Sequence, residues 1–149
     1  MGILSLFPSI IHTSKIVDFL PIKKELIHYI HKEKEKDPYG TSISNIGGWQ
    51  SKDHYAKFKN PLLDSIVILT NGIIKDMTVF KSNIRLEFLN MWININKKGN
   101  SNTKHIHPMC DLSGVFWINQ PKNSGDIFFE SPHLYNYYSH INCLNEELK

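Results

Sequence analysis

The chain has 149 residues, of which 41% are hydrophobic and 21% are charged, as expected for one soluble globular domain with a buried core. The formal net charge of +3 comes from lysines that are scattered along the chain, so it does not indicate a nucleic-acid surface, and the apolar runs are too short to cross a bilayer. The two cysteines, Cys110 and Cys143, form no disulfide framework, and the N-terminus lacks the basic start of a signal peptide. We therefore expect a single domain, residues 1–149, in a cytoplasm.

The first part, residues 1–80, is predicted to contain one strand and two helices. Residues 4–12 are apolar enough for an opening strand, in which Pro8 favours a sheet edge. A first helix is predicted from Pro21 to about Lys36, and a second from Leu62 to about Met77. The buried stripe expected in the first helix consists of Ile22, Leu26, Tyr29 and Ile30, and its charged end, residues 32–36, is expected to lie in solvent with i, i+3 ion pairs.

Between the two helices, residues 41–51 contain a Gly-Gly pair followed by a tryptophan. Gly47 and Gly48 allow backbone geometry that few other residues adopt. Trp49 could line a pocket or pack in the core, and buried packing is the commoner role of a single tryptophan.

The stretch from residue 83 to residue 132 is predicted to hold the core strands. Residues 88–96 alternate between apolar and polar side chains, which is the period of a half-buried strand, and Gly99 is suited to the turn that follows. Two further strands are predicted at residues 111–118 and 126–130, separated by a loop.

A His-x-His pair lies between the first two of these strands. In an extended segment His105 and His107 share one face, about 7 Å apart from Cα to Cα, and Ile106 points the other way, into a core. Both imidazoles could then reach one divalent cation, and Pro108 ends the segment directly afterwards.

Five pieces of the chain, in this order, resemble the 2-oxoglutarate/Fe(II)-dependent oxygenases found in tailed phages and bacteria. The resemblance covers most of residues 3–132. Its pieces are Ser44-Asn-Ile-Gly-Gly-Trp-Gln-Ser51, Trp92-x-Asn-x-Asn-x-x-Gly99, Asn102-x-x-His-x-His-Pro108, Leu112-Ser-Gly-Val115 and Ser124-Gly-Asp-Ile-x-Phe129.

The resemblance implies an α+β fold, in which two helices pack on a double-stranded β-helix of the jelly-roll or cupin type, with Fe(II) as the metal and 2-oxoglutarate as co-substrate. By position, His105 matches the first ligand of the family's usual His-x-Asp/Glu motif, and His107 stands where the carboxylate commonly is. Asp111 is the nearest substitute carboxylate. Since it would lie about 13 Å beyond His107 in a continuous strand, only a tight turn at residues 108–110 could bring it back.

The family also has a distal histidine, followed by a basic residue that pairs with the far carboxylate of 2-oxoglutarate. His133 and His140 are the late histidines of this chain, and neither has the strand context of that motif. The single arginine, Arg85, precedes the histidine pair, and Lys149 is the basic residue of the C-terminal end. We therefore expect a family member that lacks its last strands, whose open sheet favours self-association or a complementing chain.

Two other functions are compatible with the sequence. A jelly-roll module of a phage could have kept the scaffold without catalysis. A structural or hydrolytic zinc site would need three or four ligands, and two are placed. Nucleophilic catalysis has little support, because Cys110 is a sequence neighbour of His107 and Ser113-Gly114 lacks the strand-turn-helix setting of a nucleophile elbow. The substrate, a small molecule or a macromolecule, is not indicated by any motif.

Overall fold

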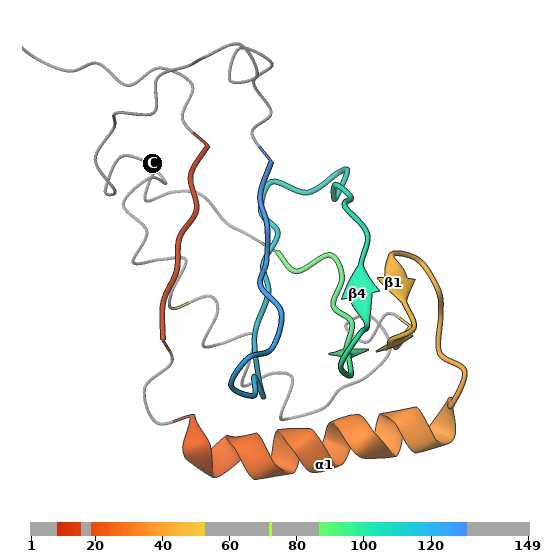
Figure 1. The fold of residues 1–149 in the computed structure, drawn as a ribbon. Coiled ribbons are helices and arrows are strands. Elements are labelled where there is room, and N and C mark those ends of the chain that lie inside the picture. Colours follow the sequence, from red (N-terminus) through yellow and green to blue (C-terminus); the bar gives the residue numbers. More distant parts are fainter. Residues whose placement is uncertain (1–8, 16–18, 53–71, 73–86, 131–149) are drawn as a thin grey trace, which may run out of the picture. The chain divides into compact units, whose positions relative to one another are not determined.

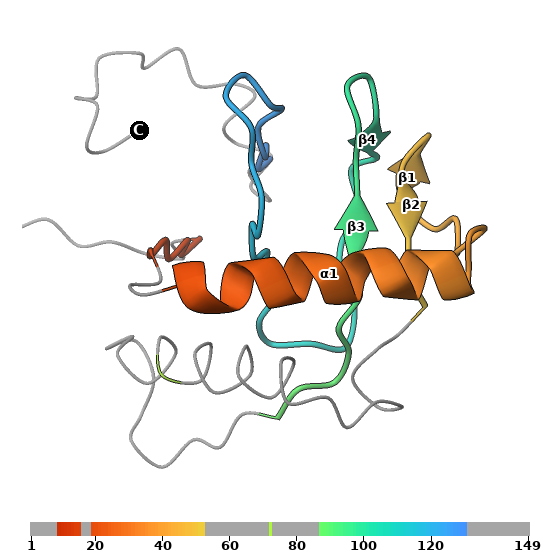
Figure 2. The same ribbon diagram turned by 90° about the horizontal axis from the view of Figure 1, so that it is seen from below.

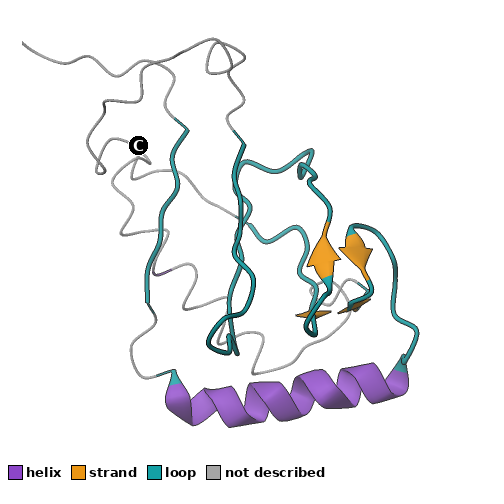
Figure 3. Ribbon diagram, in the orientation of Figure 1, coloured by secondary structure: helices purple, strands orange, loops and turns teal. Residues whose placement is uncertain are grey.

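The computed structural model describes residues 9–15, 19–52, 72 and 87–130. In chain order these residues form α1 (Leu20–Lys36), β1 (Asn45–Ile46), β2 (Trp49–Gln50), β3 (Asn94–Ile95) and β4 (Ser101–Asn102) (Figure 1 and Figure 3). The chain divides into two compact units, residues 1–12 with 125–149 and residues 13–124, and all five elements belong to the second unit. Within the described ranges, no helix combines the length and the apolar character that crossing a membrane requires.

Helix α1 confirms the first predicted helix almost residue for residue. It begins at Leu20 with Pro21 in its first turn, where a missing backbone N–H costs nothing. It ends at Lys36, and the N–H of the next residue, Asp37, donates to the carbonyl of Glu33. The lysines of the last turn complement the helix dipole.

The inner face of α1 supplies the centre of the described core. Leu26 is 1% exposed, and burial of such a side chain contributes about 1.5–3 kcal/mol. Phe19 and Phe116 meet edge to face, with ring centroids 5.1 Å apart. The partly buried side chains around Leu26 are Phe19, Ile22, Tyr29, Met91, Phe116 and Ile118.

The four strands form two antiparallel pairs, and each pair joins residues that are far apart in the sequence. Asn45 lies opposite Asn102 and Ile46 opposite Ser101, so β1 pairs with β4. Trp49 lies opposite Ile95 and Gln50 opposite Asn94, so β2 pairs with β3 (Figure 2). Segments 44–51 and 93–103 therefore form a unit that we call the paired hairpins.

The predicted core strands are much shorter than expected or absent. Of residues 88–96 only Asn94–Ile95 is a strand, and residues 9–12, 105–107, 111–118 and 126–130 have no strand. Alternation predicts that one side of a segment is apolar, but a strand also needs a hydrogen-bonded partner. Several apolar side chains of these segments are exposed, Val115 to 59% and Phe128 to 88%. Ile106 is 84% exposed, so the prediction that it points into a core is wrong. The described residues thus form a small α+β arrangement with short antiparallel strands, and they do not show the predicted jelly roll.

The charged end of α1 differs in one respect from the prediction. Glu33 is 7% exposed, although residues 32–36 were expected to lie in solvent. It pairs with Lys36 one turn later, which confirms the predicted i, i+3 ion pair. Because a buried carboxylate needs a partner, this pairing accounts for the burial of Glu33.

Some predicted elements lie outside the described residues. These are the start of the opening strand and the segment after Pro132. Of the second predicted helix, residues 62–77, only Gly72 is described, and its backbone is helical. Two N-terminal helices are therefore not supported, and the division into residues 1–80 and 83–132 stays a prediction.

Candidate metal centre

Two adjacent glycines allow the paired hairpins to approach closely. Gly47 has φ of +73°, and a Cβ at this position would lie 2.5 Å from Nδ2 of Asn100. A Cβ on Gly48 would overlap Oδ1 of Asn96. At both positions an added side chain would have to displace the end of an asparagine side chain of segment 93–103, so the Gly-Gly pair that the sequence singled out lets segment 44–51 lie against segment 93–103.

Ser44 holds the chain just before the histidine pair. Its buried backbone carbonyl accepts hydrogen bonds from the N–H of Thr103 (2.7 Å) and from Oγ1 of Thr103 (3.2 Å). Its hydroxyl accepts a third bond, from Nδ2 of Asn102, at 3.2 Å. Three bonds to one residue, about 60 positions earlier in the chain, fix the backbone at Thr103.

Ser51 plays the same part at the other end of the paired hairpins. Its N–H donates to the carbonyl of Ile93, and its Oγ accepts from the N–H of Ile93, both at 2.9 Å. Trp49, which is 6% exposed, confirms the prediction of buried packing, and its Nε1–H donates to the carbonyl of Asp37 at 2.9 Å. These bonds place the residue next to Ile93, Trp92, in a defined position.

The ring of His105 is hydrogen-bonded to the backbone of Thr103. Its Nδ1 is 2.7 Å from the carbonyl oxygen of Thr103. A carbonyl can only accept, so Nδ1 carries the hydrogen of this bond. In neutral His105 the lone pair is then on Nε2, which is the arrangement common in metal-ligating histidines.

The ring of His107 lies between two other rings. Its centroid is 4.8 Å from that of His105, with the ring planes 69° apart, and 5.4 Å from that of Trp92, with the planes nearly parallel at 26°. Desolvation by burial, and next the charge of His105, hold the pKa of His107 below its ordinary value of 6.5. Near neutral pH, His107 is therefore uncharged and keeps a lone pair for a metal.

The two imidazoles are in edge-to-face contact, with their ring centroids 4.8 Å apart. Imidazole is the commonest metal ligand in proteins, and two neighbouring rings are the kind of pair that one divalent cation can share. The structure thus brings the predicted pair together, although in a loop and not in a strand, and their role as metal ligands stays a prediction.

The tight turn considered for Asp111 is present. Pro108 and Met109 form a turn, in which Met109 has φ of +65°, and the thiol of Cys110 donates to the carbonyl of His107 at 3.1 Å. Even so, no group of three potential metal ligands occurs among the described residues, so Asp111 does not complete a site with the histidines there. The other predicted candidates lie outside the described residues: Arg85, His133, His140 and Lys149.

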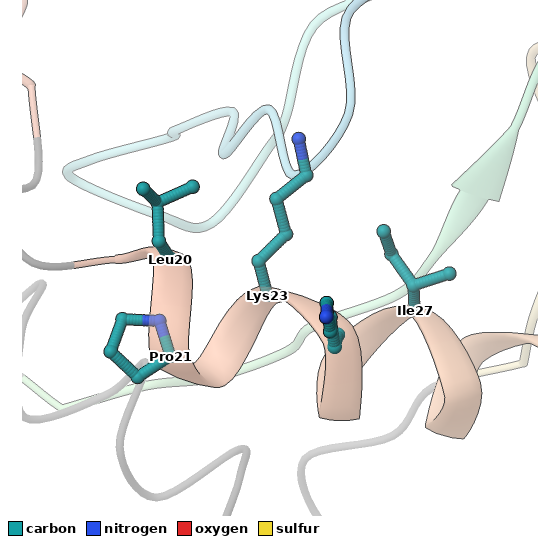
Figure 4. A pocket seen from close by; sticks show the side chains of 5 residues that line it. Leu20, Pro21, Lys23 and Ile27 are labelled. Atoms are coloured by element: carbon teal, nitrogen blue, oxygen red, sulfur yellow. The ribbon is translucent and has the colours of Figure 1, made fainter.

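A shallow pocket on the first turns of α1 contains none of the predicted ligands. It is lined by Leu20, Pro21, Lys23, Lys24 and Ile27 (Figure 4). Its surface is apolar except for the two lysines, and it offers no group that would bind a divalent cation.

Comparison with known proteins places the histidine pair in a recognised family region. Residues 90–147 match a family that is described as "Putative 2OG-Fe(II) oxygenase". The match covers less than half of the chain, and it includes β3, β4, Trp92 and both histidines. No curated protein and no solved structure gave a match. The family implies Fe(II) and 2-oxoglutarate as cofactor and co-substrate.

Sequence reasoning missed the residues that support the histidines. Thr103 is a ring partner through its backbone carbonyl, a group that every residue has, so no side-chain motif indicates it. Trp92 stands 15 residues before His107, and only folding brings them together. The signal for Ser44 was its place at the start of a piece that carries the family resemblance, without any indication of what it would contact.

Proposed function

We propose that this protein is an Fe(II)- and 2-oxoglutarate-dependent oxygenase in which His105 and His107 are two of the protein ligands of the metal. The observation that carries the proposal is the 4.8 Å contact of these two rings within the region that matches the oxygenase family. Non-haem iron oxygenases use a small set of protein ligands and leave positions open for the co-substrate and oxygen, and imidazole is a suitable ligand for iron.

The described donors fit a ferrous ion through their protonation states. The hydrogen bond to Thr103 occupies Nδ1 of His105, which leaves Nε2 for the metal. His107 is neutral at the pH at which ferrous iron would bind, because its pKa is lowered. A metal therefore has no proton to displace from His107, which favours its binding near neutral pH.

When bound, the ferrous ion and 2-oxoglutarate would supply oxidation of a substrate, coupled to decarboxylation of the co-substrate. The side chains of the protein have simpler tasks. His105 and His107 hold the cation, and Trp92 covers one face of the His107 ring, which restricts rotation of the ring and keeps water from that face.

The replacement of the usual carboxylate by His107 changes the charge of the site. Two neutral imidazoles leave the positive charge of the ion uncompensated, whereas a carboxylate would cancel part of it. We therefore propose that this chain binds Fe(II) weakly and turns over 2-oxoglutarate slowly, and that His107→Asp, which restores the usual motif, increases the affinity.

We further propose that the chain has the jelly-roll fold. Apolar alternation in residues 111–118 and 126–130, together with the family match, supports this fold. Protection of alternate backbone amides from hydrogen exchange in both segments would be expected for paired strands. Rapid exchange throughout both segments would contradict it.

The experiment is to measure Fe(II) binding under anaerobic conditions and oxygen-dependent formation of succinate from 2-oxoglutarate. His105→Ala and His107→Ala should each weaken Fe(II) binding and abolish turnover. His28→Ala and His31→Ala are matched controls, since both histidines lie exposed on α1, and they should leave binding and turnover unchanged.

If the His105 and His107 variants bound Fe(II) as well as the control variants, the proposed function would be wrong.

A further inference from the structure

We infer that Asn102 and Thr103 are positioning residues, which fix the ring of His105 by tying the Thr103 carbonyl to the buried backbone of Ser44. The inference rests on the proposed function insofar as His105 is taken to be a metal ligand. Its structural part, the orientation and tautomer of the ring, can be tested without any metal.

The first step is the contact with the ring itself. The carbonyl oxygen of Thr103 lies 2.7 Å from Nδ1 of His105, two residues later in the chain. His105 is exposed, and within the described residues its ring makes no other hydrogen bond. The bond to Thr103 therefore orients the ring only if the Thr103 carbonyl itself has a fixed position. Without this bond, rotation of the side chain would direct Nε2 and Nδ1 toward the metal alternately.

The second step is what holds the carbonyl. Thr103 donates twice to the carbonyl of Ser44, from its N–H at 2.7 Å and from its Oγ1 at 3.2 Å. Asn102 donates from Nδ2 to Oγ of Ser44 at 3.2 Å. Ser44 is buried and belongs to the paired hairpins, so it is a rigid anchor, whereas Asn102 and Thr103 are themselves exposed. The exposed side chains of Asn102 and Thr103 thus donate hydrogen bonds to a buried residue, Ser44.

The third step concerns the tautomer. A histidine ring free in water favours the form with hydrogen on Nε2, which would put the hydrogen where the metal should bind. The Thr103 carbonyl requires the opposite form, with hydrogen on Nδ1. The positioning residues therefore prepare His105 as a ligand before any metal arrives, which avoids the cost of reorganisation on binding.

The experiment uses the full-length, metal-free protein with 15N-labelled histidine, at a pH where the imidazoles are neutral. Long-range 1H–15N correlation spectra distinguish Nδ1–H from Nε2–H in each ring. We expect His105 to be in the Nδ1–H form, and the exposed rings of His28 and His31 on α1 serve as references within the same sample. An Nε2–H form of His105 in the wild-type protein would refute the inference without any variant.

The variant that tests the anchors is Asn102→Ala combined with Thr103→Val, which removes both side-chain bonds to Ser44 and keeps the backbone. We expect it to shift His105 toward a mixture of tautomers, and to weaken binding of Ni²⁺, used as the probe metal, by about 10-fold, the lower end of the effect of losing such a partner. Ser101→Ala, on the same strand, is the matched control, and it should change neither result.

The outcomes separate the inference from the proposed function. If the double variant keeps the wild-type tautomer and Ni²⁺ affinity, Asn102 and Thr103 are not positioning residues. If the tautomer shifts as expected but His105→Ala leaves Ni²⁺ binding unchanged, the positioning of the ring is upheld and the metal assignment of the proposed function is wrong.

Discussion

Gly40 is the glycine at which an added methyl group should be most costly. Its φ is +60°, and a Cβ there would overlap the backbone oxygen of Gln50 and would lie 2.7 Å from Nε1 of Trp49. The oxygen of Gln50 accepts from the N–H of Thr41 at 2.8 Å, and Trp49 Nε1–H donates to the carbonyl of Asp37 at 2.9 Å. Backbone atoms cannot move aside as the end of a flexible side chain can, so Gly40→Ala should strain or break both bonds.

The expected loss in free energy of unfolding is the sum of the backbone strain and the lost hydrogen bonds. A left-handed conformation costs an L-residue about 1–2 kcal/mol. Loss of the two hydrogen bonds adds about 0.5–1.5 kcal/mol each. We therefore expect Gly40→Ala to lower the free energy of unfolding by about 2–5 kcal/mol, a large part of the stability of a small domain.

Gly99→Ala provides a matched control for this prediction. Gly99 also has positive φ, +86°, but nothing lies within 4 Å of a Cβ built on it. It should therefore lose only the backbone part, about 1–2 kcal/mol. Urea unfolding followed by circular dichroism would measure both variants. Equal losses of free energy in the two variants would refute the packing of Gly40 against β2.

Three further predictions concern ionisation and the core. Trp92→Ala should raise the pKa of His107 toward its ordinary 6.5, because desolvation is the main cause of its lowering and Trp92 stacks on the His107 ring. NMR titration of the ring would measure this pKa, and an unchanged value would contradict the stacking of Trp92 on His107. The stability that neutral His107 gives is present above its unfolded-state pKa and is lost as the pH falls through the lowered value, so this pH dependence should flatten in the variant. Lys52→Met should raise the pKa of Asp37, because the hydrogen bond from Lys52 is the largest cause of its lowering, and NMR titration of the carboxyl group would measure the change. The stability linked to this carboxylate is present above pH 3.8 and is lost as the pH falls through the lowered pKa. Leu26→Ala should reduce the free energy of unfolding, measured in urea, by about 2–5 kcal/mol. Leu20→Ala, at the exposed first residue of α1, is the control, and a similar loss in both variants would contradict the burial of Leu26 in the core.

Features set by near neighbours in the chain could be predicted from the sequence. Helix α1 follows from Pro21 and from apolar side chains spaced for one helix face, and both are local signals. Gly99 has the positive φ that suits the predicted turn, and of the Gly-Gly pair Gly47 has positive φ whereas Gly48 does not. His105 and His107 lie together because they are two residues apart, which keeps their rings close even though the segment is not a strand.

Features that depend on distant partners could not be predicted. Alternation in residues 111–118 indicates which side is apolar, but it does not say which segment supplies the hydrogen bonds, and in the described residues no strand forms there. The pairing of residues 44–51 with 93–103 and the stack of Trp92 on His107 are likewise non-local. The burial of Glu33 was missed because a charged run usually lies in solvent.

The support of the candidate site extends beyond the region that matches the oxygenase family. The match begins at residue 90, yet the bonds that hold Ile93 and Thr103 come from Ser51 and Ser44. If residues 44–51 separate from the matched region, the backbone groups at both positions lose their partners, and the carbonyl that orients His105 loses its anchor. Because these contacts join distant parts of the chain, they form only when the whole unit folds, and a metal that binds the positioned ring must stabilise that unit by mass action. If His105 is a metal ligand, as proposed, metal binding and the pairing of the hairpins are therefore linked in one folding equilibrium.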